Sequence, residues 1–565
     1  MFTSKKMLES ILGSTFYSRF VIIVFFQIIS ILMEVFSISL IIPILDLLFG
    51  ESQNQYTLYL QENLINFSLK NILFFTLLIF FFKFFFLIYI SFKRNQLMRD
   101  INNYLSSKIT SYYLNLKFLS YQKNSSSKFI RDANDVRFAV DYVRGCENLI
   151  TGFCVTGGFF IFSLIFNFKL TLVIFIYFLI FGLIYYITFN SKVKYWGKKR
   201  RELEKDRFKV LSNIFTSLVN IKLFAKEKFF LKRFMNKNNE FETNILKQKI
   251  VQDIPKNYFE LLSIILIMIS ILIVSSQDKS QNLENIILNL AIMIAILYKV
   301  TPSIMKIILN KQLMNFSHEA TIKFLESTRP SKIKLRSENN SNLIFNLKNK
   351  IELKDVSFRY SSKNEEVLKK INLKINTGEM IGIKGESGQG KSTLVNILTG
   401  LMKPYKGKIL SDNKNIFSNV KEWQKNICYV PQNLNLLGES IRENIAFGSE
   451  RKNIDNTKIK KILIRLNLKK FINKLSDKIN EENLNFSGGQ IQRIGIARLL
   501  YHNRSLLILD EATNSLDLNN ERKVLADLKK IKKDKIIIVI SHRKMSHRNF
   551  DKIFEIKEGK LNRID

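Results

Sequence analysis

The chain has 565 residues, which is too many for one ordinary hydrophobic core and predicts two or more domains. Its formal net charge of +39 would suit a nucleic-acid-binding protein. The basic residues crowd between long apolar segments, however, as they do in membrane proteins, so we do not expect nucleic acid as a partner. The three cysteines, Cys146, Cys154 and Cys428, have no metal-like spacing and build no disulfide framework. We expect them to be inert packing residues.

Six apolar segments in the N-terminal half fit membrane-spanning helices. Each is near the ~20 residues that a helix needs to cross a bilayer. The first runs on past Pro43 without a small-residue cleavage site, so it is predicted to be a span and not a signal peptide. We therefore expect a transmembrane domain over 1–326, with spans at about 20–40, 72–91, 149–166, 170–189, 258–275 and 286–305.

The charge of the connections predicts the orientation of these spans. The connections after the second and fourth spans are long and rich in Lys and Arg, whereas Lys70 is the only basic residue of 50–71 and Lys279 the only one of 277–285. Basic loops stay in the cytosol, so both termini are predicted to be cytosolic. The stretches 103–118 and 201–241 are helical in composition. We expect the helices to continue beyond the bilayer and to turn round in the cytosol.

The C-terminal part, 351–565, has the pattern of a soluble α/β domain that follows a polar linker at 327–350. Strands are predicted at 351–359, 371–375 and 380–384, and a helix at 393–401. The pattern G-x-x-x-x-G-K-S lies between the last strand and the helix, which is the context that a phosphate-binding loop needs. Backbone amides and the helix N-terminus favour phosphate there. Lys391 is expected to reach the β and γ phosphates, and Ser392 to bind Mg²⁺. The loop comprises Gly385, Glu386, Ser387, Gly388, Gln389, Gly390, Lys391 and Ser392, and Thr393 follows it.

Two adjacent carboxylates follow a further buried strand at 505–509. Asp510 suits the Mg²⁺ shell. Glu511 is placed to orient or deprotonate an attacking water. The alternative is an exposed acidic strand end, and the phosphate loop in the same domain argues against it.

The segment 485–493 resembles the signature of ABC transporters, which usually has Leu where this chain has Phe486. The resemblance implies that Tyr360 stacks on adenine and that Gln432 senses Mg²⁺. It also implies that Asp517 lies in the loop that crosses the dimer interface and that His542 contacts the γ-phosphate. Lys391, Glu511 and His542 would then be catalytic. The signature residues expected at the nucleotide are Ser487, Gly488, Gly489 and Gln490.

The resemblance covers essentially the whole chain and implies an exporter-type half transporter. The implied fold is an all-α six-helix transmembrane domain followed by an α/β P-loop ATPase domain, with ATP and Mg²⁺ as cofactors. In this family each signature faces the other subunit's phosphate loop, so the implied partner is a second copy of the chain or a related half transporter. One departure is the short segment 478–483, which replaces a Gly- and acid-containing stretch; Glu481 and Glu482 are the acidic residues left there.

Four lysines of the membrane half suggest an anionic substrate. Lys83 and Lys299 lie deep in predicted spans, Lys306 follows seven residues after Lys299 on the same helical face, and Lys256 precedes the fifth span. Ionisable residues inside a membrane are costly and mark substrate paths. The alternative is that these lysines snorkel to the headgroups.

Segments 33–43, 255–260 and 297–302 resemble bacterial flippases of lipid-linked oligosaccharides. We expect 56–67 to be the external amphipathic helix of that group or a plain loop. The resemblance implies an ATP-hydrolysing flippase in the bacterial inner (cytoplasmic) membrane that moves an amphipathic, lipid-linked or similar anionic substrate outward, with membrane lipids around it.

Other functions share much of this pattern. A lipid A-type, multidrug or peptide exporter would carry every ATPase motif, so only the lysines and the external segment distinguish it. An ATP-gated channel or regulator would keep the architecture without stoichiometric transport. The six predicted spans argue against a soluble ABC ATPase of DNA repair or translation.

Overall fold

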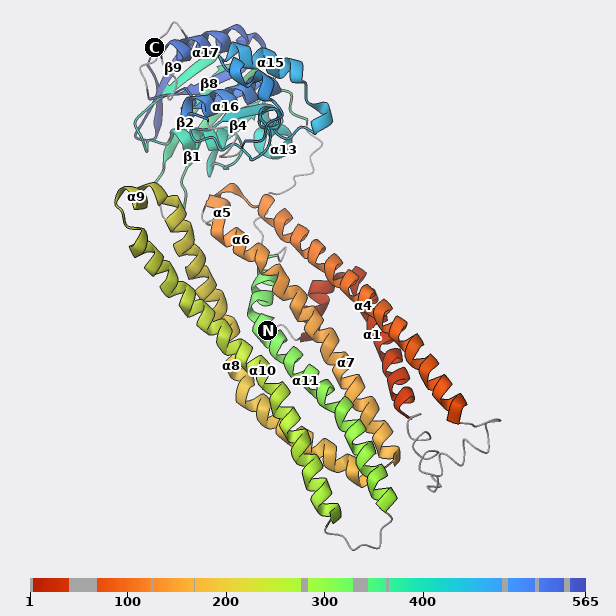
Figure 1. Cartoon of the computed structure of the whole chain (residues 1–565). Coiled ribbons are helices and arrows are strands. Elements are labelled where there is room, and N and C mark those ends of the chain that lie inside the picture. Colours follow the sequence, from red (N-terminus) through yellow and green to blue (C-terminus); the bar gives the residue numbers. More distant parts are fainter. Residues whose placement is uncertain are drawn as a thin grey trace. The chain divides into compact units, whose positions relative to one another are not determined.

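The computed structural model describes ten stretches of the chain (Figure 1). The predicted external segment 56–67 and Asp517 lie outside them, as does most of 478–483. Contacts divide the chain into two compact units, one of Met1–Leu116 and Ser120–Leu335 and the other of Lys117–Leu119 and Arg336–Asp565. The described residues are 4–39, 69–122, 126–166, 168–275, 283–328, 344–361, 365–479, 486–513, 518–542 and 549–564.

The first unit is helical. A helix satisfies the backbone hydrogen bonds of a long apolar segment within the segment itself, without water. The long helices are interrupted by short turns, and α8 and α10 are joined through the short helix α9 at the turn that the sequence predicts. The helices are α1 (Ser4–Ser39), α4 (Leu69–Leu114), α5 (Phe118–Gln122, whose first two residues are assigned to the second unit), α6 (Ser126–Asn134), α7 (Val136–Phe166), α8 (Phe168–Thr216), α9 (Leu218–Leu223), α10 (Glu227–Ser275) and α11 (Leu283–Ser327).

Within the described residues, five helices are long and apolar enough to cross a membrane. The sixth predicted span, 286–305, lies on α11, several of whose side chains fall outside the description. Its helix is present, and its place in a membrane stays a prediction. The five stretches are Lys6–Phe36, Leu73–Leu114, Lys128–Leu164, Thr171–Thr216 and Glu227–Leu272.

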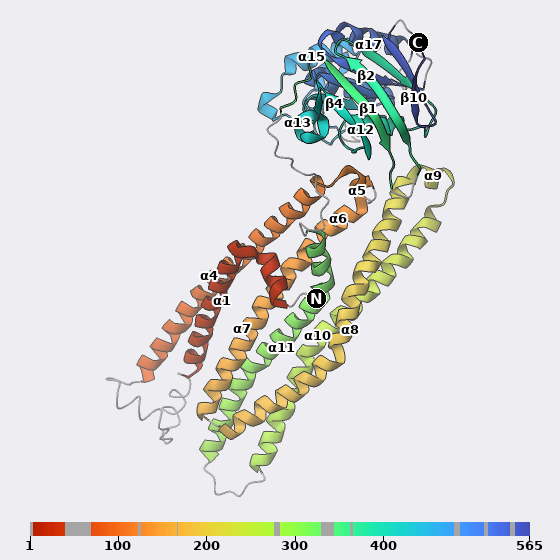
Figure 2. The ribbon, with the colours of Figure 1, turned by 180° about the vertical axis from the view of Figure 1, so that it is seen from behind.

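Helix α11 packs along α7, α8 and α10, while α1 packs chiefly on α4 and α7 (Figures 1 and 2). Two glycines allow α11 to approach closely. A Cβ at Gly145 of α7 would stand 2.6 Å from the Cγ of Met314, and one at Gly197 of α8 would stand 2.5 Å from the backbone oxygen of Phe316. Small residues are what close helix packing in a membrane protein needs.

A buried ion network ties α6 and α7 to α8 at the ends that carry the basic connections. Arg201 Nε lies 2.8 Å from Asp135 Oδ2, and its Nη2 lies 3.2 Å from Asp132 Oδ1. The Arg200 guanidinium lies 3.7 Å from the centroid of the Phe138 ring. Part of the Lys/Arg excess that predicts orientation therefore also serves packing between helices.

The second unit has two sheets. An antiparallel sheet has the order β2-β1-β4-β5, and a mainly parallel sheet has the order β10-β9-β3-β8-β7-β6. In the second sheet β9, β3, β8, β7 and β6 are parallel, and β10 closes the edge as an antiparallel hairpin with β9. The strands are β1 (Lys350–Phe358), β2 (Leu368–Asn376), β3 (Met380–Lys384), β4 (Lys406–Ser411), β5 (Lys414–Asn415), β6 (Ile427–Val430), β7 (Leu506–Asp510), β8 (Ile536–Ile540), β9 (Lys552–Lys557) and β10 (Lys560–Arg563).

Apolar runs such as Ile-Ile-Ile-Val-Ile in β8 arise because both faces of the parallel sheet are covered. In β8, Ile537 and Val539 join the core on one face, and Ile536, Ile538 and Ile540 join the core on the other. The predicted fold class, a helical transmembrane domain followed by an α/β domain, is confirmed. The α-helices of this unit are α12 (Lys391–Leu398), α13 (Val420–Gln424), α14 (Ile441–Ile445), α15 (Asn456–Arg465), α16 (Gly488–His502) and α17 (Leu518–Lys530), with short 3-10 turns at Ile416–Ser418, Arg451–Asn453, Lys469–Lys474 and Lys532–Asp534.

Candidate nucleotide site

Strand order brings the predicted site residues together. Strands β3, β8, β7 and β6 are parallel neighbours, so the loops after them leave the sheet at one edge. The phosphate loop follows β3, His542 follows β8, Asp510 and Glu511 end and follow β7, and Gln432 follows β6. Residues far apart in the sequence therefore meet at the carboxyl edge of a single sheet.

The phosphate loop joins β3 to α12 and needs glycine at two positions. Gly385 has φ 155°, and a Cβ there would stand 2.7 Å from the backbone oxygen of Ile556. Gly390 caps α12 in the left-handed region with φ 103°. The first backbone amides of a helix have no partner within it, so this loop presents free donors where a phosphate would sit.

Lys391, the first residue of α12, is 6% exposed. Its ammonium donates to the carbonyl oxygens of Gly385 at 2.5 Å and Glu386 at 2.9 Å. Burial lowers the pKa of Lys391, while the neighbouring carboxylates of Glu511 and Asp510 act in the opposite direction. The loop backbone thus holds the positive charge beside the two acids that the sequence places in the site.

The Glu511 carboxylate is positioned through both of its oxygens. Its Oε1 lies 2.7 Å from Nε2 of His542, and its Oε2 accepts a hydrogen bond from Nε2 of Gln432 at 2.8 Å. His542 Nε2 also lies 3.2 Å from Nζ of Lys391. Glu511 has φ 54°, so its backbone turns sharply as it leaves β7. The three residues expected to be catalytic, Lys391, Glu511 and His542, therefore form one connected cluster.

Asp510 is held by a residue that the sequence patterns do not single out. The hydroxyl of Tyr429, on β6, donates to Asp510 Oδ2 at 3.1 Å. Burial raises the pKa of Asp510, and the Tyr429 hydrogen bond lowers it. Burial, with the nearby Asp510 charge, also raises the pKa of Tyr429. Asp510 thus keeps one oxygen fixed by a neutral phenol beside the charged cluster.

Tyr360, which follows β1, contacts helix α12 after the phosphate loop. Its hydroxyl is 2.9 Å from Oγ1 of Thr393, and its ring stands edge-on to Phe358 with centroids 5.2 Å apart. The side chain is 41% exposed. An exposed aromatic ring that is fixed at one end offers a flat surface on which a base can stack.

The signature residues Ser487 and Gln490 bond to one another at the start of α16. The Gln490 backbone N–H donates to Ser487 Oγ at 3.4 Å, and the Ser487 backbone N–H donates to Gln490 Oε1 at 3.1 Å. This reciprocal pair is a capping box. The side-chain Nε2 of Gln492, the fifth residue of that helix, lies 3.5 Å from the Glu511 carbonyl oxygen. The signature is thus presented at a helix start, with Gly488 and Gly489 in its first turn.

Two of the four membrane lysines meet at one carboxylate. Nζ of Lys299 on α11 lies 2.8 Å from Oε1 of Glu34 on α1, and Nζ of Lys83 on α4 lies 3.6 Å from the same oxygen. Lys306 is instead attracted by the charge of Glu147 and repelled by that of Arg94. Lys256 is exposed on α10. The sequence patterns do not single out Glu34. It is a carboxylate inside a predicted span, so the rule that singles out the lysines also applies to it.

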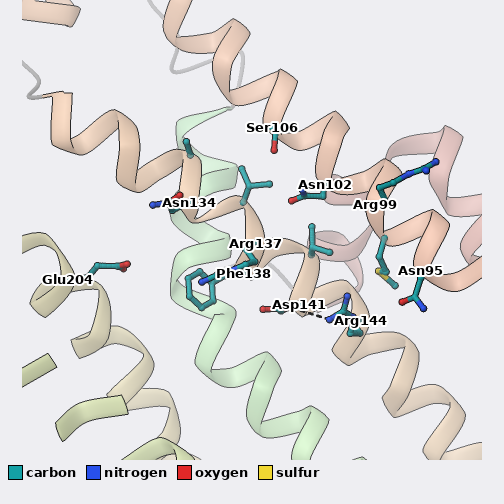
Figure 3. Close-up of a pocket in the computed structure, with 14 residues that line it drawn as sticks. Asn95, Arg99, Asn102, Ser106, Asn134, Arg137, Phe138, Asp141, Arg144 and Glu204 are labelled. Carbon is teal, nitrogen blue, oxygen red and sulfur yellow. Dashed lines mark ion pairs between the residues drawn. The ribbon is translucent and has the colours of Figure 1, made fainter. Parts of the chain in front are cut away.

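The first unit also contains a polar cavity of about 680 Å³ (Figure 3). Arg99 of α4 and Arg137 and Arg144 of α7 line it, and Arg144 pairs with Asp141 at 3.7 Å. In the described part of the chain, none of its lining residues is one that the sequence predicts for a site. The cavity is therefore separate from both the nucleotide residues and the lysine pair.

Comparison with known proteins assigns the two units. The family model "ABC transporter transmembrane region" matches residues 20–301, and the family model "ABC transporter" matches residues 368–514. The second match includes the phosphate loop, the signature and both acids.

Curated relatives match over part of their length. An export ATP-binding/permease protein of Rickettsia typhi is 40% identical over 217 residues, which are 37% of this chain and 37% of that protein. An ATP-dependent lipid A-core flippase of Haemophilus influenzae is 37% identical over 222 residues, 38% of this chain and 37% of that protein. ATP-binding cassette sub-family B member 5 of Homo sapiens is 38% identical over 217 residues, 37% of this chain and 17% of that protein. The matched stretch thus spans little more than a third of the bacterial relatives. With its transmembrane and nucleotide-site regions in a single polypeptide, the chain belongs to the ABC transporters.

Proposed function

We propose that the chain hydrolyses ATP and uses the energy to export an amphipathic substrate across a membrane. The observation that carries this proposal is the fixed Glu511 carboxylate, held by His542 and Gln432 beside Lys391 of the phosphate loop. A carboxylate that is oriented through both oxygens is suited to position an attacking water and to take its proton.

The residues of the site divide the work. The amides of 385–393 and the Lys391 ammonium bind the β and γ phosphates, and His542 steadies both Glu511 and the γ-phosphate. The ring of Tyr360 takes the adenine. Lys391 can exchange its two carbonyl partners for phosphate oxygens without leaving its place, because those carbonyls belong to the same loop.

Ser392, Gln432 and Asp510 supply the oxygen ligands that Mg²⁺ prefers. Ser392 is exposed on the first turn of α12, and the Gln432 amide donates through Nε2, which leaves its Oε1 for a cation. Mg²⁺ bound there with ATP would neutralise charge on the β and γ phosphates. The residues present thus fit the cation that the family implies.

We propose that two chains share each hydrolytic site. Ser487, Gly488, Gly489, Gln490 and Asp517 would complete the site of a second copy or of a related half transporter. The mutual bonding of Ser487 and Gln490 supports this arrangement, because it presents the signature as a preformed helix start. A two-fold dimer would place both signatures opposite both phosphate loops.

The proposed organisation keeps the predicted bounds, with a transmembrane domain at 1–326, a linker at 327–350 and an ATPase domain at 351–565. The basic connections and the ATPase domain would lie on the cytosolic side of a bacterial inner membrane. The Rickettsia and Haemophilus relatives are bacterial and are named an export ATP-binding/permease protein and a lipid A-core flippase, which supports that location.

The substrate we propose is a lipid-linked oligosaccharide or a similar anionic lipid, moved outward. The juxtaposed Lys83 and Lys299 support an anionic head group. A lipid A-type lipid is the second candidate, because relatives in this family are named lipid A-core flippases. Both carry phosphate, and they differ in the sugar and acyl parts. Lysine attracts phosphate as a point charge without the fork of arginine.

Reconstitution tests the proposal. Purified protein in liposomes should hydrolyse ATP and should move a fluorescent lipid-linked oligosaccharide, a lipid A analogue or both in an ATP-dependent way. Glu511→Gln in the same liposomes is the matched control and should move neither. ATP hydrolysis that continues in Glu511→Gln contradicts the assignment of the base. Movement of an uncharged drug but neither phosphorylated lipid contradicts the substrate class.

A further inference from the structure

An ion triad joins helices α1, α4 and α11 of the first unit. It consists of Glu34, Lys83 and Lys299. Both ammonium groups approach the same oxygen, Oε1 of Glu34, at 2.8 Å for Lys299 and 3.6 Å for Lys83. Lys83 is 7% exposed, and the Glu34 side chain is 23% exposed. The Lys299 side chain is 30% exposed, so Lys83 is the most buried member of a triad with a formal net charge of one positive unit.

The carboxylate is what allows the two lysines to lie together. Lys83 and Lys299 repel one another, and the attraction of Glu34 opposes that repulsion. A buried charge without a partner is strongly destabilising, whereas a paired one is tolerated. Glu34 is thus the counter-ion of both lysines in this conformation.

The triad also links helices that pack mainly elsewhere. Helix α1 lies chiefly on α4 and α7, whereas α11 lies chiefly on α7, α8 and α10. The bond from Lys299 to Glu34 therefore adds a charged link between α11 and α1, whose apolar side chains share a core that includes Leu12 and Phe324. Weakening this bond removes the charged part of that link and leaves the apolar part in place.

We propose that Glu34 is a built-in counter-ion that an anionic lipid head group displaces, and that its displacement weakens the link between α1 and α11. This inference rests on the function proposed above and names the residue that senses the charge of the substrate. A phosphate monoester carries about −1.5 to −2 units of charge near pH 7, against −1 for a carboxylate. It can therefore neutralise both ammonium groups, which Glu34 alone does not.

Displacement separates the Glu34 carboxylate from both lysines. A zwitterionic head group brings its own cation and cannot supply the same net charge. The triad thus favours head groups with net negative charge, and binding of such a group changes the link between α1 and α11. Sugars and acyl chains would be recognised by other residues.

The test measures ATPase activity of the full chain in phosphatidylcholine liposomes with increasing phosphatidic acid, whose head group is a phosphate monoester. We expect phosphatidic acid to raise wild-type activity. Glu34→Gln should start from a raised activity and should need about five-fold less phosphatidic acid for half of its maximal effect. Asp141→Asn, which removes the partner of Arg144 in the same unit, is the matched control and should behave as wild type.

Lys299→Met keeps the Lys83–Glu34 pair and breaks the charged link to α11. It should also start from a raised activity, and it should lose the response to phosphatidic acid, which gives a second reading should Glu34→Gln not fold. Equal basal activity and equal response curves in wild type and Glu34→Gln overturn the inference. So does a response to soluble pyrophosphate as large as that to the lipid. Absence of any ATP hydrolysis in wild type would instead contradict the proposed function, so the two failures are distinguishable.

Discussion

Gln432 donates a hydrogen bond of 2.8 Å to Glu511, and so joins the loop after β6 to the end of β7. The other Glu511 oxygen faces His542 at 2.7 Å. Two groups, one after β6 and one after β8, therefore fix the same carboxylate. The carboxylate acts on the attacking water and not on the binding of ATP. Variants of Glu511 and Lys391 should therefore separate hydrolysis from nucleotide binding.

Glu511→Gln should abolish hydrolysis and retain ATP. The amide keeps the size of the side chain but cannot take a proton from water, so we expect a fall in turnover of about 10²–10⁴-fold. Phosphate release and the nucleotide retained after gel filtration measure the two quantities. Glu450→Gln, at an exposed acid of the same domain, is the control and should change neither.

Lys391→Ala should behave differently from Glu511→Gln. It removes an ammonium group that contacts the phosphates of bound ATP and also stabilises the charge that develops in the transition state. The affinity for ATP and the rate of hydrolysis should therefore fall together. Equilibrium binding of a fluorescent ATP analogue distinguishes the variants. Unchanged affinity in Lys391→Ala would mean that the ammonium does not reach the phosphates.

Tyr429→Phe should shift the pH profile of the ATPase. The Tyr429 hydroxyl donates to Asp510 and lowers the pKa of that carboxyl, against the burial that raises it. Removing the hydroxyl leaves burial unopposed by this bond, so the pKa of Asp510 rises. Since Asp510 must be ionised to hold Mg²⁺, activity should be lost at a higher pH on the acid side, with little change on the plateau. Tyr501→Phe, at a tyrosine bonded to the Asp455 amide, should leave the profile in place.

The local parts of this site can be predicted from sequence, and the contacts between strands cannot. The phosphate loop and the Asp510–Glu511 pair lie beside recognisable strands, so their patterns identify them. The bonds from Tyr429 to Asp510 and from Gln432 to Glu511 depend on β6 lying next to β7, with Tyr429 opposite Ile508. Strand order and register come from packing of the whole sheet and leave no local signal.

The membrane unit follows the same division. Apolar length predicts the helices, and the basic connections predict where they turn. That Lys83 and Lys299 share Glu34, while Lys256 is exposed, depends on how α1, α4 and α11 rotate about their axes. A seven-residue spacing groups Lys299 with Lys306, but it cannot choose their partners on other helices.

Mixed dimers test whether sites are shared between chains. A dimer of one Ser487→Ala chain and one Lys391→Ala chain should keep one intact site if each phosphate loop works with the partner's signature. A dimer of wild type and a chain with both changes should keep none. Differently tagged chains, purified as heterodimers, allow ATPase activity to be compared directly. The opposite order, with activity only in the second dimer, would show that each chain works alone.

The last prediction concerns the sign of the charge in the membrane unit. Lys83→Glu together with Lys299→Glu should abolish flipping of a pyrophosphate-linked lipid, because carboxylates at these positions and Glu34 would repel it in a medium of low dielectric constant. ATP hydrolysis should continue, since its residues lie in the second unit. Arginine at both positions should retain or improve transport, because its guanidinium binds phosphate through two parallel hydrogen bonds. Thermal melting of both double variants guards against a loss of fold, and Lys256→Glu, at an exposed lysine, provides a comparison. Normal flipping by a folded double-glutamate variant would identify Lys83 and Lys299 as anchors at the headgroups and would remove the support for a phosphorylated substrate.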